Sequence, residues 1–417
     1  MKTTPSLTLI ALLALAVSTR ADTTSLDALE ARLAALETRA PNTLNVQWRD
    51  GITFASDDKA FQLRLGGRVQ NDWAFYLDAD EALEDQVGQL EDGIEFRRIW
   101  LELGGTIYEN TEYMVTLDFA GGRTGVRNMF LGFRNVPYLG GIRIGHQLEP
   151  FSLESITPNK YLTFIERGLP SAFYPFYNTG IRVSRTLADR RMTLSYGLFR
   201  ETDDTGKIVS DSGYNATARL TGLPLASDDG RRLVHLGFSA SRKGTPDGET
   251  TFRARPENRQ APFFAGVTNL PADKVLLAGL EFAAVLGSFS AQAEWYMASP
   301  DTEGNDPEFS GYYAQVSYFL TGEHRPYNRA GGSFDRVRPA SNFRGKDGGC
   351  GAWEIAFRVS GIDFNDGDID GGEVLNLTAA VNWYINPNLK IAVNYIHSDL
   401  KEVGEAHTLL TRFQFDF

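Results

Sequence analysis

Apolar and polar residues alternate with a period of two along most of this chain, from about residue 60 to its end at residue 417. The segments FQLRL (61–65) and TRFQFDF (411–417) show the pattern clearly. Successive side chains of a β-strand point to opposite faces of a sheet, so this period predicts strands rather than helices. The longest apolar run, within 7–17, is too short for a membrane-spanning helix, which needs about 20 apolar residues.

About sixteen alternating segments can be distinguished. They begin near Ala60, Ile94, Thr111, Val126, Gly141, Gly180, Arg191, Ser212, Arg232, Lys274, Ser288, Phe309, Gly351, Glu373, Asn388 and Glu405. Tight joints contrast with long joints at 78–93, 243–273, 322–349 and 398–404. An even strand number, with short turns at one end and long loops at the other, is typical of outer-membrane barrels. We therefore expect an all-β fold, a transmembrane 16-stranded antiparallel β-barrel that occupies residues 46–417.

A soluble β-sandwich shares the alternation and is the alternative. It would not need tall apolar faces that end in aromatic residues, such as Trp73, Phe75, Trp295, Tyr318, Trp383 and Tyr384. A closed barrel does need them, because its backbone pairs with itself while its outer face meets lipid. Its inner face can be wet and polar, which fits a chain of which only 42% is hydrophobic.

The acidic balance of the chain restricts its partners. With 41 Lys and Arg against 53 Asp and Glu, the formal net charge is −12, which argues against a nucleic-acid binder. The single cysteine, Cys350, excludes an internal disulfide, and no Cys/His group has the spacing of a metal site. The five histidines are scattered, and no Ser/His/acid spacing indicates a hydrolase. We therefore expect neither an enzyme nor a cofactor.

The run DGDIDG at 366–371 begins like a calcium-binding loop. A complete loop would place an acidic residue six positions after Gly371, where the sequence has Leu377. We interpret 363–373 as an acidic loop, with a cation site as the alternative.

The amino terminus has the features of an export signal. A short basic start precedes the apolar stretch 7–17, and a small-x-Ala cleavage site ends at Ala21. This arrangement predicts a signal peptide over 1–21.

A heptad pattern follows the predicted signal peptide. In 25–39, four leucines repeat at alternating spacings of three and four, with Glu and Arg at the flanking e and g positions. The pattern predicts a helical segment in 22–45, which forms either a trimeric coiled coil or a monomeric amphipathic helix.

The segment 149–179 interrupts the strand rhythm. It contains four prolines and has neither strand alternation nor a long helical face. Loops of this length in compact domains are usually functional. In a barrel wide enough for water, we expect it to fold inward and narrow the lumen. A surface loop or a latch between subunits is the alternative.

Arginines on the predicted inner face indicate an anion pathway. A guanidinium is permanently charged and offers paired donors to oxyanions. Charges inside a low-dielectric wall also focus the field, so a pore can be positive in an acidic protein. In the alternation of each strand, Arg64, Arg68 and Arg98 stand at positions of the polar, inner face. Arg97 has the opposite parity and needs a β-bulge to reach the lumen.

Several motifs resemble the phosphate-selective porins O and P. FRRIWLELGGTIYEN (96–110) is similar to a signature of that family, and further matches are LGGRVQNDW (65–73), TFIER (163–167), SGYYAQVSYFLTGEHRPY (310–327), GAWEIAFRVS (351–360) and VNWYINPN (381–388). The resemblance runs from about residue 60 to the end. It implies a trimeric 16-stranded anion channel whose third loop enters the pore. The C-terminal Phe417 also fits the aromatic ending of such barrels.

The resemblance also implies roles for individual residues. By local match, Arg98, Lys160 and Arg167 are expected near the constriction, and a paired arginine of the family supports a lumen position for Arg97. An arginine ladder that leads from the outer mouth is expected at Arg253, Arg255 and Arg259.

Four positions depart from the family's pattern. Trp100 stands where an anion-binding tyrosine is expected, Ser155 where a loop lysine is expected, and Glu257 where a ladder arginine is expected. Arg127 appears where a pore acid can occur, which adds positive charge. The charges of the predicted pore residues, taken together, still predict an anion channel. Orthophosphate need not be the preferred anion.

We therefore expect a passive porin in the outer membrane of a Gram-negative-type bacterium. It would admit small anions such as phosphate and other oxyanions, contact membrane lipid and lipopolysaccharide, and form a homotrimer. Within the same class, the alternative is a general porin or one that tolerates organic anions and sugars. In another class, the alternative is an envelope-tethering or adhesive barrel in which the coiled coil and the loops carry the function.

Overall fold

The computed structural model describes residues 28, 31 and 44–417, apart from 49, 210–212, 305 and 347. The predicted signal peptide, 1–21, and nearly all of the predicted helical segment, 22–45, lie outside the described residues and stay predictions. Within the described part of the chain, no helix is both long and apolar enough to cross a lipid bilayer.

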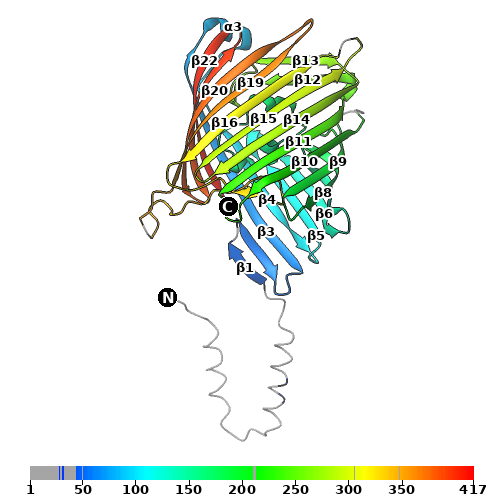
Figure 1. The fold of residues 1–417 in the computed structure, drawn as a ribbon, viewed down its shortest axis with the longest axis vertical. Helices are drawn as coiled ribbons and strands as arrows, with labels where there is room; N and C mark the ends of the chain where they lie inside the picture. The colour runs from blue at the N-terminus through cyan, green and yellow to red at the C-terminus, as the bar shows by residue number, and fades with distance from the viewer. Residues whose placement is uncertain are drawn as a thin grey trace.

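One continuous antiparallel sheet dominates the fold (Figure 1). Its main strands, in chain order, are β3 (Phe61–Ala79), β4 (Gly93–Ile107), β5 (Thr111–Asp118), β6 (Gly125–Val136), β7 (Gly140–Leu148), β8 (Tyr177–Leu187), β9 (Met192–Arg200), β10 (Asn215–Ala226), β11 (Arg232–Gly244), β14 (Lys274–Leu286), β15 (Phe289–Asp301), β16 (Phe309–Phe319), β19 (Ala352–Asp366), β20 (Ile369–Asn386), β21 (Leu389–Leu400) and β22 (Gly404–Asp416).

The remaining elements are short. The strands form three hairpins: β1 (Leu44–Trp48) with β2 (Ile52–Ser56), β12 (Glu249–Ala254) with β13 (Ala265–Pro271), and β17 (Tyr327–Asn328) with β18 (Ser333–Phe334). The helices lie in the joints between strands: α3 (Glu81–Val87), α4 (Leu153–Ile156), and the 3₁₀ helices η1 (Ala120–Gly122), η2 (Asn159–Tyr161), η3 (Leu169–Phe173) and η4 (Pro246–Gly248).

The pairing of β22 with β3 closes the sheet into a barrel. Leu409 lies opposite Phe75 and Asp416 lies opposite Arg68, so the first and last strands of the wall have paired edges. The closed wall has sixteen strands in the described residues, and each begins within a few residues of its predicted start. The predicted all-β, 16-stranded antiparallel barrel is therefore confirmed.

The hairpin of β1 and β2 extends the wall at the start of β3. Ile52 of β2 lies opposite Leu65, in a stretch of β3 that β22 does not reach. Figure 1 shows this hairpin projecting from the end of the barrel at which the chain terminates. The alternation in the sequence did not reveal it, because each strand is only 5 residues long.

The wall is apolar outside and polar inside. On β20, Leu375 and Leu377 each keep 37% of their surface exposed. The alternating polar residues Asn376 and Thr378 are completely buried. A soluble protein buries apolar side chains and exposes polar ones. The reversed arrangement fits a wall whose outer face meets hydrocarbon, and it argues against the soluble sandwich.

The joints at one end of the barrel are short, with one exception. At the opposite end most joints are long, but short turns at 367–368 and 401–403 join β19 to β20 and β21 to β22. The long joint predicted at 398–404 is therefore wrong.

Tight turns at 108–110, 188–191 and 387–388 lie at the end where the chain terminates. The long joint 320–351 follows β16, which is the twelfth of the sixteen wall strands counted along the chain. Neighbouring strands are antiparallel, so every second wall strand ends at the same end of the barrel. The joint 320–351 therefore lies at the end of these tight turns. We expected it among the long loops at the opposite end, and that expectation is wrong.

Contacts with the barrel strands and with the joint 149–176 hold this exceptional joint in place. Arg336 Nη2 is 2.5 Å from Asp416 Oδ2 on β22. Phe334 is buried in a cluster with Leu153 of α4, and its backbone N–H donates to Thr157 Oγ1 at 3.3 Å. The joint 320–351 therefore packs against the joint 149–176 instead of projecting into solvent along its whole length.

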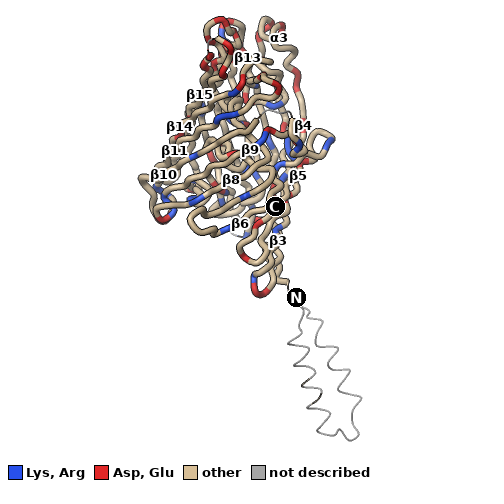
Figure 2. Tube along the Cα trace, turned by 90° about the vertical axis from the view of Figure 1, so that its right-hand side faces the viewer, with Lys and Arg blue, Asp and Glu red and all other residues tan. Residues whose placement is uncertain are grey.

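Acidic residues gather at the end of the barrel that carries α3, opposite the tight turns (Figure 2). We call this end the acidic rim; it includes Glu81 and Glu84 of α3 and the predicted acidic loop 363–373. That loop is a tight hairpin between β19 and β20, in which Asp366 lies opposite Ile369. A turn this short cannot form the 12-residue loop of a calcium site.

Candidate functional site

The segment 149–176, between β7 and β8, is held by polar side chains of the last strands of the wall. The carbonyl oxygen of Leu162 accepts a hydrogen bond from Lys390 Nζ at 2.9 Å, and that of Thr163 accepts one from Asn382 Nδ2 at 2.8 Å. The segment is irregular, so its backbone groups need partners outside a regular ladder, and these side chains supply them. Further hydrogen bonds join Ile165 to Arg412, Lys160 to Gln414 and Leu169 to Ser360.

Aromatic packing anchors both ends of the same segment. Phe151 and Phe173 are almost completely buried in one cluster with Tyr296 of β15. The ring of Phe173 also meets that of Phe252 of β12 edge-on, with centroids 5.5 Å apart. The β12–β13 hairpin is therefore docked against this segment.

Glu166 lies among three arginines. Arg97 Nε is 2.9 Å and Arg412 Nη2 is 2.7 Å from Glu166 Oε1, and Arg98 Nη1 is 3.7 Å from the same oxygen. Burial alone would raise the pKa of Glu166, but the guanidinium charges hold this pKa well below its usual range. The carboxylate therefore stays ionised at neutral pH and neutralises part of the cluster.

Arg97 reaches this cluster through a β-bulge in β4. Gln70 of β3 lies opposite Arg98, and the next residue, Asn71, lies opposite Phe96, so Arg97 is an extra residue in the register. The bulge that strand parity required is thus present. Arg98 points inward, where its Nη1 donates to Gln70 Oε1 at 2.9 Å.

Arg167 follows Glu166 in sequence but has partners of a different kind. Its guanidinium donates to the backbone carbonyl oxygens of Glu154 at 3.2 Å and Ser155 at 3.3 Å. Among the described residues, no carboxylate oxygen lies within 4.0 Å of it. The charge of Arg167 is therefore held in place by the segment without being neutralised.

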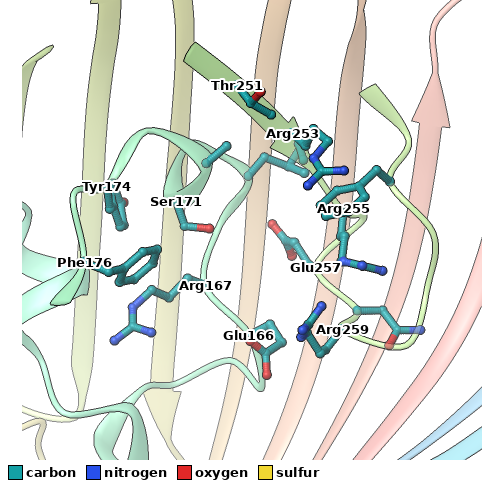
Figure 3. Close-up of a pocket in the computed structure, with 15 residues that line it drawn as sticks. Glu166, Arg167, Ser171, Tyr174, Phe176, Thr251, Arg253, Arg255, Glu257 and Arg259 are labelled. Carbon is teal, nitrogen blue, oxygen red and sulfur yellow. The ribbon is translucent and has the colours of Figure 1, made fainter. Parts of the chain in front are cut away.

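A cavity of about 370 Å³, here the upper cavity, lies between the segment 149–176 and the β12–β13 hairpin. Figure 3 shows Arg167 on one side of this cavity and Arg253, Arg255 and Arg259 on the other. The three predicted ladder residues are thus brought together around one space.

Two of the three ladder arginines lie over an aromatic ring. The guanidinium carbons of Arg253 and Arg255 lie 4.3 and 3.9 Å from the ring centroid of Phe263, and Arg255 donates to the carbonyl oxygen of Ala261. Arg253, Arg255 and Arg259 have no carboxylate within 4.0 Å in the part of the chain that the structure describes. Their charges are therefore available to a solute in the cavity.

A second cavity of about 270 Å³, here the lower cavity, also has Arg167 in its lining. Its lining contains Arg64, Arg68, Lys160 and Arg167, and one acidic residue, Glu102. Glu102 is ion-paired with Arg68 and lies 3.5 Å from Arg64. Lys160 Nζ lies 3.3 Å from Asp416 Oδ2, and burial together with the charge of Arg68 lowers the pKa of Lys160.

The structure shows the surroundings of the four departures from the family's pattern. Trp100 is 7% exposed and packs against Arg68, whose guanidinium carbon lies 4.4 Å from its ring centroid. Ser155 lies in α4, and its backbone carbonyl oxygen accepts a hydrogen bond from the guanidinium of Arg167.

The other two departures are charged residues in ion pairs. Glu257 binds Arg358 of β19, which is completely buried, and accepts from Thr378 Oγ1 at 2.9 Å. Arg127 lies 3.1 Å from Asp118 and 2.7 Å from Asp204. Glu257 adds no unpaired negative charge to the upper cavity, and Arg127 supplies no unpaired positive charge.

Sequence reasoning did not select two arginines that organise the site, Arg358 and Arg412. Arg412 Nε and Nη2 each lie 2.6 Å from the carboxylate of Asp72 on β3, across the seam of the barrel. Strand parity could have found Arg412, because it shares the inner face of β22 with Gln414 and Asp416. The link to Glu166 was not accessible, because it depends on the path of an irregular segment.

Comparisons with known proteins agree with this architecture. The family model for phosphate-selective porins O and P matches residues 63–417. Porin O of Pseudomonas aeruginosa is 28% identical over 420 residues, which cover 89% of this chain and 92% of that protein.

Solved structures share the fold at low identity. The outer membrane channel DcaP of Acinetobacter baumannii has a TM-score of 0.56 at 11% identity and covers 87% of this chain and 99% of its own. The anion-selective porin from Comamonas acidovorans has a TM-score of 0.55 at 12% identity, with 85% and 99% covered. The chain therefore belongs to the phosphate-selective porin O and P family, and it is an outer-membrane porin rather than an enzyme.

Proposed function

We propose that this porin conducts small anions and that Arg167 controls their passage between the two cavities. The observation that carries the proposal is that Arg167 belongs to the lining of both. Both linings also have an excess of cationic residues. The upper one has Arg167, Arg253, Arg255 and Arg259 against Glu166 and Glu257, and the lower one has Arg64, Arg68, Lys160 and Arg167 against Glu102.

In this proposal, the segment 149–176 is the loop that folds inward and narrows the lumen. Its hydrogen bonds to Asn382, Lys390 and Arg412, on strands distant in sequence, support this position. Its aromatic anchors at Phe151 and Phe173 support a fixed rather than a swinging loop. A fixed loop keeps the guanidinium of Arg167 at a constant place in the pathway.

Weak and exchangeable contacts allow an anion to move on. Arg167 donates to carbonyl oxygens at 3.2 and 3.3 Å, so an anion competes with neutral acceptors and not with a carboxylate. Arg253, Arg255 and Arg259 offer further positions of similar character in the upper cavity. Several sites of moderate strength favour conduction, whereas one very strong site would trap the ion.

The cluster around Glu166 favours a broad anion preference over strict phosphate selectivity. Arg97, Arg98 and Arg412 already surround a carboxylate of the protein itself. An external oxyanion must compete with that carboxylate for the same donors. Because the cluster accepts a carboxylate, small organic carboxylates are the second candidate solutes beside phosphate and other inorganic oxyanions.

Reconstitution in a planar lipid bilayer tests the proposal. In a potassium chloride gradient, we expect a reversal potential of the sign that indicates chloride permeation. We also expect chloride current to fall when phosphate, sulfate or a dicarboxylate is added. Cation preference without block by any of these anions would contradict the proposal, and the absence of conductance would favour the adhesive alternative.

Assembly and export stay predictions. We propose that the barrel forms a homotrimer, contacts lipopolysaccharide and is exported by the signal peptide at 1–21. The mass of the detergent-solubilised protein, measured by light scattering with the detergent subtracted, tests the trimer. A monomeric mass in several mild detergents would contradict it.

A further inference from the structure

We propose that His397, Glu405 and His407 form a binding site for a divalent transition-metal cation, of which Zn²⁺ is the best example. His397 belongs to β21, and Glu405 and His407 belong to β22. In the antiparallel register, His397 lies directly opposite His407. The burial patterns of both strands place the three side chains on the outer face of the wall, close to the acidic rim and away from the pore.

The donor atoms of the three residues are already close together. Among the residues that the structure describes, one ligand atom from each of the three lies within 4.8 Å of the others. His397 Nε2 is 3.9 Å from Glu405 Oε2, and the two imidazole centroids are 4.8 Å apart. Tetrahedral zinc, with bonds of about 2.1 Å, holds its ligand atoms about 3.4 Å apart. Small side-chain rotations therefore suffice, and the half-exposed Glu405 has the freedom to make them.

Tyr395 orients one of the two imidazoles. Its hydroxyl oxygen lies 2.7 Å from His407 Nδ1, and its ring stacks on that of His407 with centroids 5.9 Å apart. When Nδ1 donates to the phenol oxygen, Nε2 carries the lone pair that a metal needs. Metal-binding histidines commonly have such a partner on the second nitrogen, because it fixes the tautomer and the ring.

The ligand types select the class of cation. Two imidazoles and one carboxylate suit Zn²⁺, Ni²⁺ or Cu²⁺, whereas Ca²⁺ and Mg²⁺ prefer oxygen ligands. The surrounding charge also favours a cation, since Asp399 lies opposite Glu405 in the register. The nearest lysine in sequence does not compete, because Lys401 Nζ binds Glu373 at 2.7 Å.

The position of the site gives the ion a structural consequence. An ion shared by His397 and His407 would tie β21 to β22 near their ends. On its other side, β22 pairs with β3, with His407 opposite Asp78, so the tie lies beside the seam that closes the barrel. Binding only to the folded wall would stabilise that wall by mass action.

Titration of the untagged, full-length mature protein in detergent micelles with zinc chloride tests the site. We expect saturable binding of one Zn²⁺ per chain by calorimetry, and at least tenfold weaker binding for His397→Gln and for His407→Gln. We expect Tyr395→Phe to weaken binding about tenfold, because it removes the hydrogen-bond partner of a metal ligand. Co²⁺ in place of Zn²⁺ should give the visible absorption of a four-coordinate site in the wild type and lose it in His397→Gln.

His324→Gln is the matched control, because His324 lies in the joint 320–351 at the other end of the barrel and should bind as the wild type does. All variants should retain the bilayer conductance of the wild type, which shows that they are folded. No saturable zinc binding by the wild type, or equal binding by the wild type and His397→Gln, would overturn the proposal. Since the site is remote from the pore, either result would leave the anion pathway untouched.

Discussion

Two groups of arginines that line or support the lumen differ in their partners. Arg98, Arg358 and Arg412 each lie within 4.0 Å of a carboxylate and are here called the paired arginines. Arg167 and the ladder arginines have no such partner among the described residues and are called the unpaired arginines. The two groups carry the same charge, yet only the second leaves that charge available to a solute.

The difference teaches that a count of arginines does not measure the selectivity of a pore. Buried guanidinium–carboxylate pairs fix an irregular loop against a regular wall, since each charge needs its partner in a medium of low dielectric. Guanidinium groups that meet only carbonyl oxygens or rings keep their field. In the proposed pathway, structure and selectivity therefore depend on different members of one residue type.

The largest expected effect concerns the paired group. Arg358→Ala removes the partner of Glu257 and a charge 3.5 Å from Glu154, and both carboxylates are buried. Loss of one member of a buried pair costs about 3–5 kcal/mol. We expect a clearly lower urea midpoint in micelles, followed by tryptophan fluorescence. The double variant Arg358→Ala/Glu257→Gln should recover part of the loss, and an unchanged midpoint for Arg358→Ala would contradict the division into two groups.

The second effect concerns Arg167. Arg167→Ala removes the charge that both cavities share, and a hydrogen bond to a charged group is worth about 1.5–3 kcal/mol. We therefore expect the phosphate concentration that halves the chloride current to rise about tenfold or more. Arg123→Ala is the control, because that side chain is 80% exposed and lines neither cavity. An equal change in both variants would show that Arg167 has no special position.

A smaller effect of opposite sign is expected for Glu166. Glu166→Gln keeps the shape of the side chain and removes the negative charge that Arg97, Arg98 and Arg412 surround. We expect phosphate to block the chloride current at a concentration about two- to fivefold lower, which corresponds to about 0.5–1 kcal/mol. The gain is modest because Asp72 continues to neutralise Arg412. Weaker block in this variant would contradict the competition that we propose.

The smallest effect concerns the ladder and depends on salt. Arg255→Gln removes one of several charges around the upper cavity. Screening acts over about 30 Å at 0.01 M salt and about 3 Å at 1 M. We expect a measurable loss of single-channel conductance at the low concentration and almost none at the high one. Equal losses at both concentrations would indicate a steric rather than an electrostatic role.

The strand pattern of the sequence was sufficient to predict the wall. In a membrane barrel, the period of two is enforced at each strand by lipid on one side and water on the other, so the sixteen strand positions could be read directly. The bulge at Arg97 could also be predicted, because the alternation places this charged residue on the apolar, outer face unless a bulge intervenes. The β1–β2 hairpin was missed since its strands are too short to establish a period.

The site could be predicted only in part, because irregular segments set its pairings. Arg167 and the ladder arginines were selected from the sequence, but nothing in the sequence distinguished them from arginines that are neutralised. Glu257 was read as an interruption of the ladder, whereas its pairing with Arg358 depends on a contact across 101 positions of sequence. The joint 320–351 was assigned to the wrong end, because the assignment used its length and not its place in the order of the strands.

The reversal potentials of Arg167→Ala and Glu166→Gln, measured side by side in one potassium chloride gradient, test the central claim most directly. The account predicts shifts of opposite sign from the wild type, with Arg167→Ala less and Glu166→Gln more selective for chloride. Shifts of the same sign, or no shift in Arg167→Ala, would contradict it.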